Sequence, residues 1–156
     1  MQKGRRLLGA ASVGGNIFVF GGNCGDEEGW YSDAVEVYDV HADTWTELNS
    51  LPVTGPASAA TVGEFIYVFI HGNGVYRYSP STDSYVKLNT LPLKNWFSFD
   101  VTCYGSTIFL HGGAVDGASH AASAFYTYDT RSNDFTEMPK MLRERRRTAA
   151  CVVSLV

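Results

Sequence analysis

The histidines are the first residues in this sequence that could support chemistry, and their spacing argues against a metal site. Four are dispersed along the chain, and only His71 and His111 stand at comparable places, each at the end of a similar apolar run. Two imidazoles without clustered carboxylates or thiols make a poor metal site. We therefore expect no metal and no cofactor.

The cysteines and serines give no sign of a nucleophile. Cys24, Cys103 and Cys151 are an odd number without metal-type spacing, and no histidine or basic residue stands beside Cys103 or Cys151. We expect small, reduced side chains, which favours a cytoplasmic location. No nucleophile motif is present, although a Ser-His-Asp set could still assemble in three dimensions. The sequence predicts that the protein is not an enzyme.

Two polar segments carry side chains suited to holding a partner. Residues 143–147 include four arginines, and a guanidinium group can pair with a carboxylate through two hydrogen bonds. Residues 23–33 form an acidic stretch that holds Trp30 and Tyr31 side by side. A polar loop keeps large aromatics when they pack on a neighbouring element or on a partner. Both interpretations of the aromatic pair stay open. For the arginines, the alternative is a basic segment that is simply solvated.

An internal repeat positions these segments. Three stretches share a glycine three residues before an apolar run, and the runs begin 49 and then 42 residues apart. A tyrosine follows each run, and seven residues later comes another aromatic. The runs begin at Ile17, Ile66 and Ile108, the tyrosines are Tyr38, Tyr78 and Tyr128, and the later aromatics are Trp45, Tyr85 and Phe135.

The repeat predicts β-structure throughout. Short apolar runs rich in β-branched and aromatic residues, bounded by glycine, are typical of strands buried on both faces. Each repeat therefore reads as four antiparallel strands, and four-stranded sheets repeated every 40–50 residues are the blades of a propeller. The predicted repeats cover about residues 7–52, 57–92 and 97–142, and residues 147–156 resemble the first strand of a fourth.

The repeats resemble those of the kelch family. Its double glycine, Tyr-Asp and Trp stand in the first repeat as Gly21-Gly22, Tyr38-Asp39 and Trp45. The third repeat keeps Gly112-Gly113 and Tyr128-Asp129, while the second has drifted furthest. We expect the glycine pairs to be turn residues rather than a phosphate site, because no helix follows them. The resemblance implies an all-β, kelch-type propeller segment of three four-stranded antiparallel blades, plus the first strand of a fourth.

The resemblance also implies a function. Kelch propellers commonly act as scaffolds for protein–protein interaction, such as ubiquitin-ligase substrate adaptors or cytoskeletal binders. In the adaptors, basic residues of the blade-to-blade connections hold acidic peptides, and this role carries to Arg145 and Arg147. Trp30 and Tyr31 are further candidate contacts with a partner. The alternative is a kelch-like enzyme of the specifier-protein, sialic-acid mutarotase or oxidase type, with a site in the central funnel.

Composition and charge limit the classes of partner that the chain can bind. The chain has 156 residues, 45% of them hydrophobic, and a net charge of −4, so it offers no general attraction to nucleic acid. No apolar stretch is long enough to span a membrane. Three blades do not close a ring, so we expect further kelch blades or a second copy of the chain as additional partners. We also expect that the chain by itself is not a stable monomer.

Overall fold

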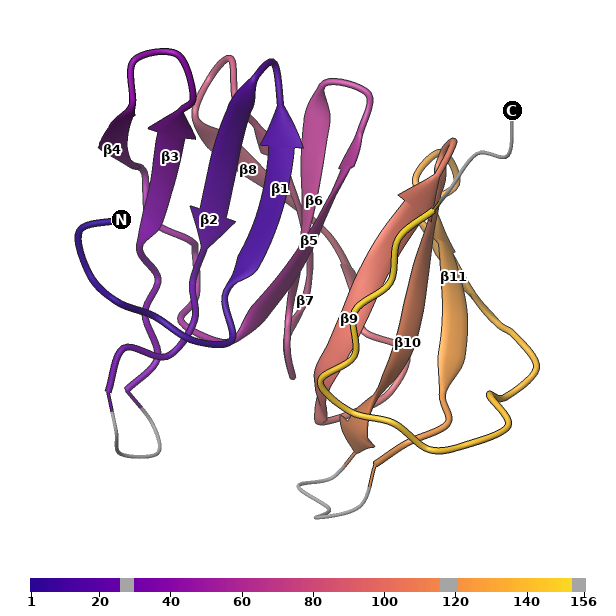
Figure 1. Cartoon of the computed structure of the whole chain (residues 1–156). Coiled ribbons are helices and arrows are strands. Elements are labelled where there is room, and N and C mark those ends of the chain that lie inside the picture. Colours follow the sequence, from indigo (N-terminus) through magenta and orange to yellow (C-terminus); the bar gives the residue numbers. More distant parts are fainter. Residues whose placement is uncertain (26–29, 116–120, 153–156) are drawn as a thin grey trace.

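The structure is a computed structural model, and it describes residues 1–25, 30–115 and 121–152. Its regular elements over those residues are β-strands, and none of the described residues forms a helix that could span a membrane. The strands follow one another along the chain (Figure 1). They are β1 (Gly9–Val13), β2 (Asn16–Phe20), β3 (Val35–Asp39), β4 (Thr44–Leu48), β5 (Ala57–Val62), β6 (Phe65–Ile70), β7 (Gly74–Ser79), β8 (Ser84–Thr90), β9 (Trp96–Tyr104), β10 (Thr107–Val115), β11 (Phe125–Asp129) and β12 (Asp134–Glu137).

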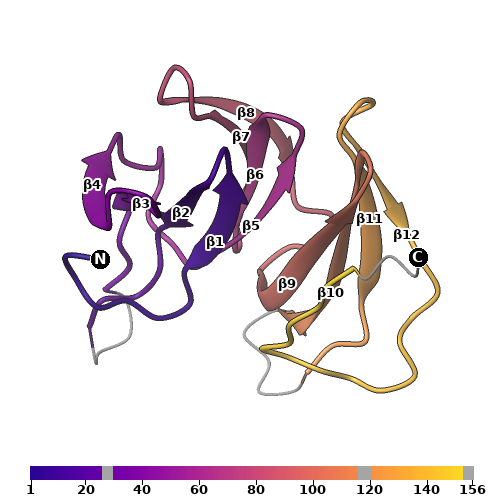
Figure 2. The same cartoon turned by 45° about the horizontal axis from the view of Figure 1, so that its top comes forward.

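The strands form three antiparallel sheets of four, each in sequence order. Strands β1 to β4 make blade 1, β5 to β8 make blade 2, and β9 to β12 make blade 3. The first strands of the blades, β1, β5 and β9, lie next to one another, and the sheets fan out from them (Figure 2). This arrangement confirms the predicted all-β class and the three four-stranded blades.

The hairpin that opens each blade has the same register, so equivalent residues of the sequence repeat occupy equivalent positions in the three sheets. Ile17, Ile66 and Ile108 pair with Ser12, Thr61 and Cys103. The glycine three residues before each isoleucine has φ between 59° and 63°, a conformation that glycine adopts without steric cost. Tight hairpin turns need such backbone angles, so the repeated glycine is explained by the turn.

Blades 1 and 2 pack through aromatic side chains. We call the side of a blade that faces the preceding blade its front face, and the opposite side its rear face. Phe18 and Phe20 on the rear face of blade 1 meet Tyr78 on the front face of blade 2, with ring centroids 5.9 and 5.4 Å apart. Tyr78 is fully buried there. The first hydrophobic core is therefore the interface between two blades.

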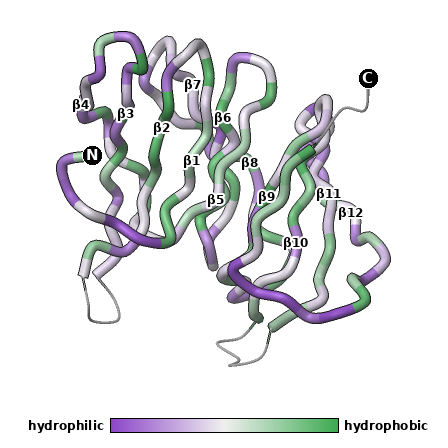
Figure 3. The backbone as a smooth tube through the Cα atoms, viewed as in Figure 1, coloured by the Kyte–Doolittle hydropathy of each residue, from purple (hydrophilic) through white to green (hydrophobic). Residues whose placement is uncertain are grey.

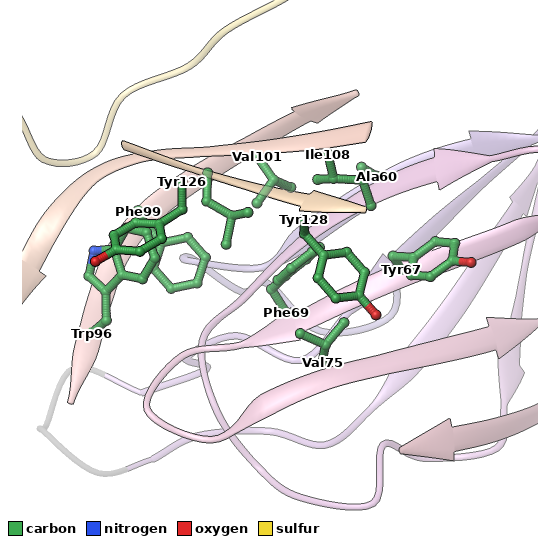
Figure 4. Packing of buried hydrophobic residues seen from close by; sticks show 11 residues of the cluster. Ala60, Tyr67, Phe69, Val75, Trp96, Phe99, Val101, Ile108, Tyr126 and Tyr128 are labelled. Atoms are coloured by element: carbon green, nitrogen blue, oxygen red, sulfur yellow. The ribbon is translucent and has the colours of Figure 1, made fainter. Parts of the chain in front are cut away.

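The second core repeats this packing between blades 2 and 3. Tyr67 and Phe69 meet Tyr128, with ring centroids 6.1 and 5.8 Å apart (Figure 4). Trp96 and Tyr126 extend the cluster toward the end where β9 begins. The second strand of each blade is largely hydrophobic, whereas the connection after β12 contains a strongly hydrophilic stretch (Figure 3). The fold is held together by contacts between blades as much as within them.

The tyrosine of each repeat fixes the turn that leads to the outer strand. The hydroxyl groups of Tyr38, Tyr78 and Tyr128 each donate to a side chain five residues on, at 2.5 to 2.8 Å. The acceptors are Asp43, Asp83 and Asn133, which all have positive φ. Aspartate and asparagine tolerate this backbone conformation better than other side chains.

The front face of blade 1 has no described blade against it. Ile17 is 39% exposed, whereas the matching Ile66 and Ile108 are fully buried. Trp45, the aromatic of this repeat, packs on Tyr38 with ring centroids 5.1 Å apart but stays half-buried. A repeated aromatic predicts a buried slot, and that expectation is wrong for Trp45. The matching Tyr85 and Phe135 are half-buried too, because this aromatic lies on the outer strand of each blade.

The expected first strand of a fourth blade does not form over the described residues. Residues 147–152 run as irregular chain past β9 and β10. In each blade the first strand is held by a ladder to the second strand, and 147–152 has no such ladder within the part of the chain that the structure describes. The Arg147 N–H nevertheless donates to the Ser98 carbonyl as the Ala57 N–H at the start of β5 donates to the Leu7 carbonyl, so the segment enters at the place where a first strand would begin.

Candidate protein-interaction surface

The connections that carry the candidate partner-binding residues lie at one end of the molecule. Antiparallel order places the β2–β3 and β10–β11 connections at the same end as the blade-to-blade connections, and Figure 1 shows them together at the bottom. Trp30 and Tyr31 belong to this end of blade 1, and Arg145 and Arg147 belong to blade 3. The two candidate pairs therefore share one end but not one blade.

The backbone around the two arginines is fixed. The Arg145 N–H donates to the carbonyl of Ala122 at 3.0 Å, and its own carbonyl accepts from Gly113 at 2.8 Å. The Arg147 N–H donates to the carbonyl of Ser98 at 3.0 Å. Both side chains are exposed, and neither guanidinium group bonds to any residue that the structure describes. A firm backbone that presents unpaired cations suits the binding of an anionic partner.

The two arginines border different hollows. Arg147 lines an axial pocket of about 260 Å³, to which all three blades contribute. Arg145 lines a largely apolar hollow of about 410 Å³ on the rear face of blade 3, with Phe109 and Phe125. The axial pocket is lined by Leu7, Leu8, Ala57, Ser58, His71, Ser98, Phe99, Asp100, Arg147 and Thr148.

His71 forms the buried wall of the axial pocket. The Ser98 N–H donates to its Nδ1 at 3.1 Å, so in the neutral ring the proton is on Nε2. Nε2 then donates to the Ser58 Oγ at 3.0 Å, and the Ser58 hydroxyl donates to the carbonyl of Phe99 at 3.0 Å. Burial lowers the pKa of His71 to about 3.

This chain of hydrogen bonds runs opposite to nucleophile activation. A general base accepts the serine proton, whereas His71 donates a proton to Ser58 and Ser58 passes its own to a backbone carbonyl. The group ties β5 and β6 of blade 2 to β9 of blade 3. His111 does not stand at the place of His71: it lies within β10 at the place of Phe69, where it lines the hollow beside Arg145 and contacts Thr148. Within the described ranges, no three His, Cys, Asp or Glu side chains gather as metal ligands.

Trp30 and Tyr31 both present exposed surface. Trp30 is 62% exposed and Tyr31 is 40% exposed. The Trp30 carbonyl accepts from the Cys24 N–H at 3.2 Å, which fixes the base of the connection. A Cβ on Gly25 would approach the Trp30 side chain to within 2.9 Å, so the side chain of Trp30 packs closely on the backbone at Gly25. Most of the indole is free to meet a partner.

The glycine pairs of blades 1 and 3 do the same structural work. The Gly21 and Gly112 N–H groups donate to Ala34 and Ala124, and the Gly22 and Gly113 N–H groups donate to Gly55 and Arg145. All four glycines have positive φ, and a Cβ on any of them would come within 2.8 Å of a backbone oxygen. The second glycine of each pair holds the connection that leads away from its blade.

Sequence reasoning missed several residues that shape this end. Arg5 is buried and forms an ion pair with Glu36, and it also donates to the Gly21 carbonyl at 2.9 Å. Trp96 donates to the Gly112 carbonyl at 2.8 Å, so it occupies in blade 3 the place that Arg5 occupies in blade 1. An arginine and a tryptophan share no residue class, so aligning the repeats by type could not reveal the match.

Comparison with known proteins places the fold. A model of the kelch motif matches residues 4–52, which correspond to blade 1. The structure published under the description "Structure of YjhT" superposes with a TM-score of 0.75 at 15% sequence identity, covering 88% of this chain. The chain spans about half of that structure, 53% of its length. In all, 159 chains of solved structures match. No curated protein matches the sequence.

Proposed function

We propose that this chain, which carries a kelch motif in its first blade and folds as kelch-type propeller blades, is a module for protein–protein interaction. The observation that carries the proposal is the pair of exposed guanidinium groups of Arg145 and Arg147, which bond to none of the described residues and stand on a fixed backbone. The partner is an acidic segment of another protein, as in substrate adaptors. Trp30 and Tyr31 provide a second contact on blade 1.

The charge of the blade 3 connection supports an acidic partner, whereas the stretch 23–33 of blade 1 at the same end is acidic. Residues 143–147 carry four arginines and one glutamate, although the whole chain has a net charge of −4. Connections that converge at one end of a propeller concentrate potential there more than isolated surface charges do. Arginine pairs with carboxylates in a planar, two-bonded geometry, which adds orientation to attraction.

The enzymatic alternative would place a reactive group in the funnel. The axial pocket does contain Ser58 and His71, but the proton order in this pair is the reverse of what acyl transfer needs. Binding of a partner requires no reactive pair of this kind, so we favour binding over catalysis for this pocket. The same walls could hold the end of a bound peptide beside Arg147.

Calorimetry with synthetic glutamate-rich peptides tests the proposal. Replacing Arg145 and Arg147 together by alanine should weaken binding by about 10-fold to 100-fold for each charged hydrogen bond lost. The melting curve should not change, because exposed arginines contribute little to stability. The measurement is made at two salt concentrations, since ionic contacts weaken with salt.

The matched control replaces Arg143 and Arg146, two other arginines of the same segment. If both double variants lose the same affinity, the segment attracts peptides only by its net charge and there is no defined site. If neither variant loses affinity, the basic connection is simply solvated. A loss confined to the Arg145 and Arg147 variant supports the site.

A further inference from the structure

Thr148 carries a hydroxyl group directly after the most basic stretch of the chain. The five residues before it, 143–147, are four arginines and one glutamate. No other serine or threonine in the sequence has more than one arginine or lysine among the five residues before it. Protein kinases select their substrates in part by such charge patterns. Arginines that lead up to a hydroxyl group suit a kinase whose substrate groove is acidic.

The segment around Thr148 lies outside the sheets, where an enzyme can reach it (Figure 1). From 142 to 152 every residue is exposed except Thr148, which is half-buried. Over the described part of the chain, three backbone hydrogen bonds hold this segment to blade 3, and all of them are formed by Arg145 and Arg147. Few hydrogen bonds and little buried apolar surface are the features of a segment that opens locally. The segment can therefore enter an enzyme's groove while the three blades stay folded.

The Thr148 side chain stands between the two candidate partner-binding arginines. It lines the axial pocket of about 260 Å³ together with Arg147, and it lines the apolar hollow of about 410 Å³ together with Arg145. Its hydroxyl group contacts Nδ1 of His111 at 3.0 Å. A group attached to this hydroxyl can therefore enter open space on either side, and each space has one of the arginines at its border.

We propose that Thr148 is a phosphorylation site for an arginine-directed protein kinase, and that the phosphate group pairs with Arg145 and Arg147. In the reaction, the Thr148 oxygen forms a bond to the γ-phosphorus of ATP, the bond from that phosphorus to the leaving ADP breaks, and a carboxylate of the kinase accepts the hydroxyl proton. The product is a phosphate ester with a charge of about −2 and three acceptor oxygens.

The phosphate changes what the basic segment can bind. Residues 143–148 have a net charge of +3 from four arginines and one glutamate, and the phosphate lowers it to about +1. A phosphate opposite arginines forms about one to three charge-assisted hydrogen bonds, so these guanidinium groups are no longer open to a carboxylate of another molecule. Phosphorylation therefore switches off the contact with an acidic partner, a step that rests on the proposed function.

Phosphorylation of the folded 156-residue chain tests the site itself. A purified arginine-directed serine/threonine kinase with ATP and Mg²⁺ should add one phosphate group, and mass spectrometry of proteolytic peptides should place it on Thr148. Thr148→Ala should abolish the modification, and Thr148→Ser should keep it. Thr90→Ala is the matched control, because Thr90 is also exposed but lies in β8 after a single lysine, and it should change nothing. Modification mainly at another residue, or only after urea unfolds the blades, overturns the proposal.

The ionisation of the phosphate tests its pairing with the arginines without any partner. The second pKa of a phosphate ester lies near about 6, and neighbouring guanidinium groups lower it because they favour the dianion. Titration followed by ³¹P NMR should therefore give a lower pKa in the phosphorylated chain than in the same chain with Arg145→Ala and Arg147→Ala, in which Arg143 and Arg146 still direct the kinase. His111 and Asp100, which also border these spaces, are common to both chains. Equal pKa values overturn the pairing.

Calorimetry with the glutamate-rich peptides connects the site to binding. The fully phosphorylated chain should bind them at least about 10-fold more weakly than the unmodified chain, as expected when a charged hydrogen bond is lost. An unchanged affinity overturns the switch. If the unmodified chain does not bind the peptides either, the proposed function fails, whereas a phosphate on Thr148 with a lowered pKa still supports the modification site and its pairing.

Discussion

The neutral state of His71 links a single residue to the stability of the blade 2–blade 3 interface. Its ring lies 4.3 Å from the ring of Phe99, centroid to centroid, with the planes tilted by 36°, and it accepts from Ser98 and donates to Ser58. Protonation would remove the acceptor on Nδ1 and place a charge among buried groups. The folded protein therefore resists protonation at this position far more than the unfolded chain does.

This difference predicts a specific loss of stability in acid. Burial lowers the folded-state pKa of His71 to about 3, so its contribution is fully present above the unfolded pKa near 6.5 and is lost as the pH falls below that value. The free energy of unfolding should fall by up to about 1.4 kcal/mol per pH unit. Urea unfolding between pH 7 and pH 4.5 measures the slope.

His71→Asn should lack that slope, because asparagine does not titrate. His41→Asn is the matched control, since His41 is exposed, and it should behave as the unchanged protein does. Equal slopes in the His71 and His41 variants would show that other groups govern the acid response.

The turns and connections show how far the elements follow from the sequence. The hairpins and the order of strands in each blade could be predicted, because a glycine, an apolar run and a tyrosine recur at fixed spacing. The bonds from Asn49 to Asp83 and from Asn89 to Asn133 could have been found by the same alignment, since both asparagines follow a leucine of the repeat. The ion pair of Arg5 with Glu36 could not, because it depends on where an irregular segment returns to the sheet.

Substitution should be particularly harmful at Gly113, which lies within strand β10. It has φ of 90°, and a Cβ would lie 2.5 Å from the Phe97 carbonyl oxygen, so both the backbone angle and the pairing of β9 with β10 would be disturbed. Gly63 has φ of 63° but no atom within 4 Å of its Cβ position. The two glycines separate the cost of the angle from the cost of the clash.

Gly63→Ala should destabilise the protein by about 1–2 kcal/mol, the cost of the left-handed conformation alone. Gly113→Ala should cost at least about 2 kcal/mol more, because backbone must move as well. Thermal or urea unfolding of the two variants gives the comparison. Equal losses would mean that β9 shifts freely to make room for the added methyl group.

The whole molecule has two blade faces that no described blade covers. Ile17 is exposed on the front of blade 1, and Phe109 and Phe125 border the open hollow at the rear of blade 3. Inside the molecule, the same positions form the two cores. Apolar surface of this kind favours association over an isolated state.

We therefore expect the 156-residue chain alone to associate or to unfold without strong cooperativity. Sedimentation velocity over a range of concentrations measures the association, and calorimetric unfolding measures the cooperativity. Ile17→Lys, on the exposed front face, should reduce the association, whereas Val86→Lys, on the exposed outer strand β8, should leave it unchanged. A compact monomer with one cooperative transition in the unaltered chain would contradict the expectation.

The glycine pairs also carry a consequence for the order in which the chain acquires structure during synthesis. The Gly22 N–H donates to the Gly55 carbonyl, and the Leu7 carbonyl accepts from the Ala57 N–H. Blade 1 thus lacks two of its backbone bonds until the ribosome has released the segment that leads into blade 2. Blade 3 depends in the same way on Arg145 and Arg147. Growth from the N-terminus therefore completes blade 1 with the start of blade 2, and blade 3 with the segment that follows it, so a pause in translation within a connection leaves the newest blade open.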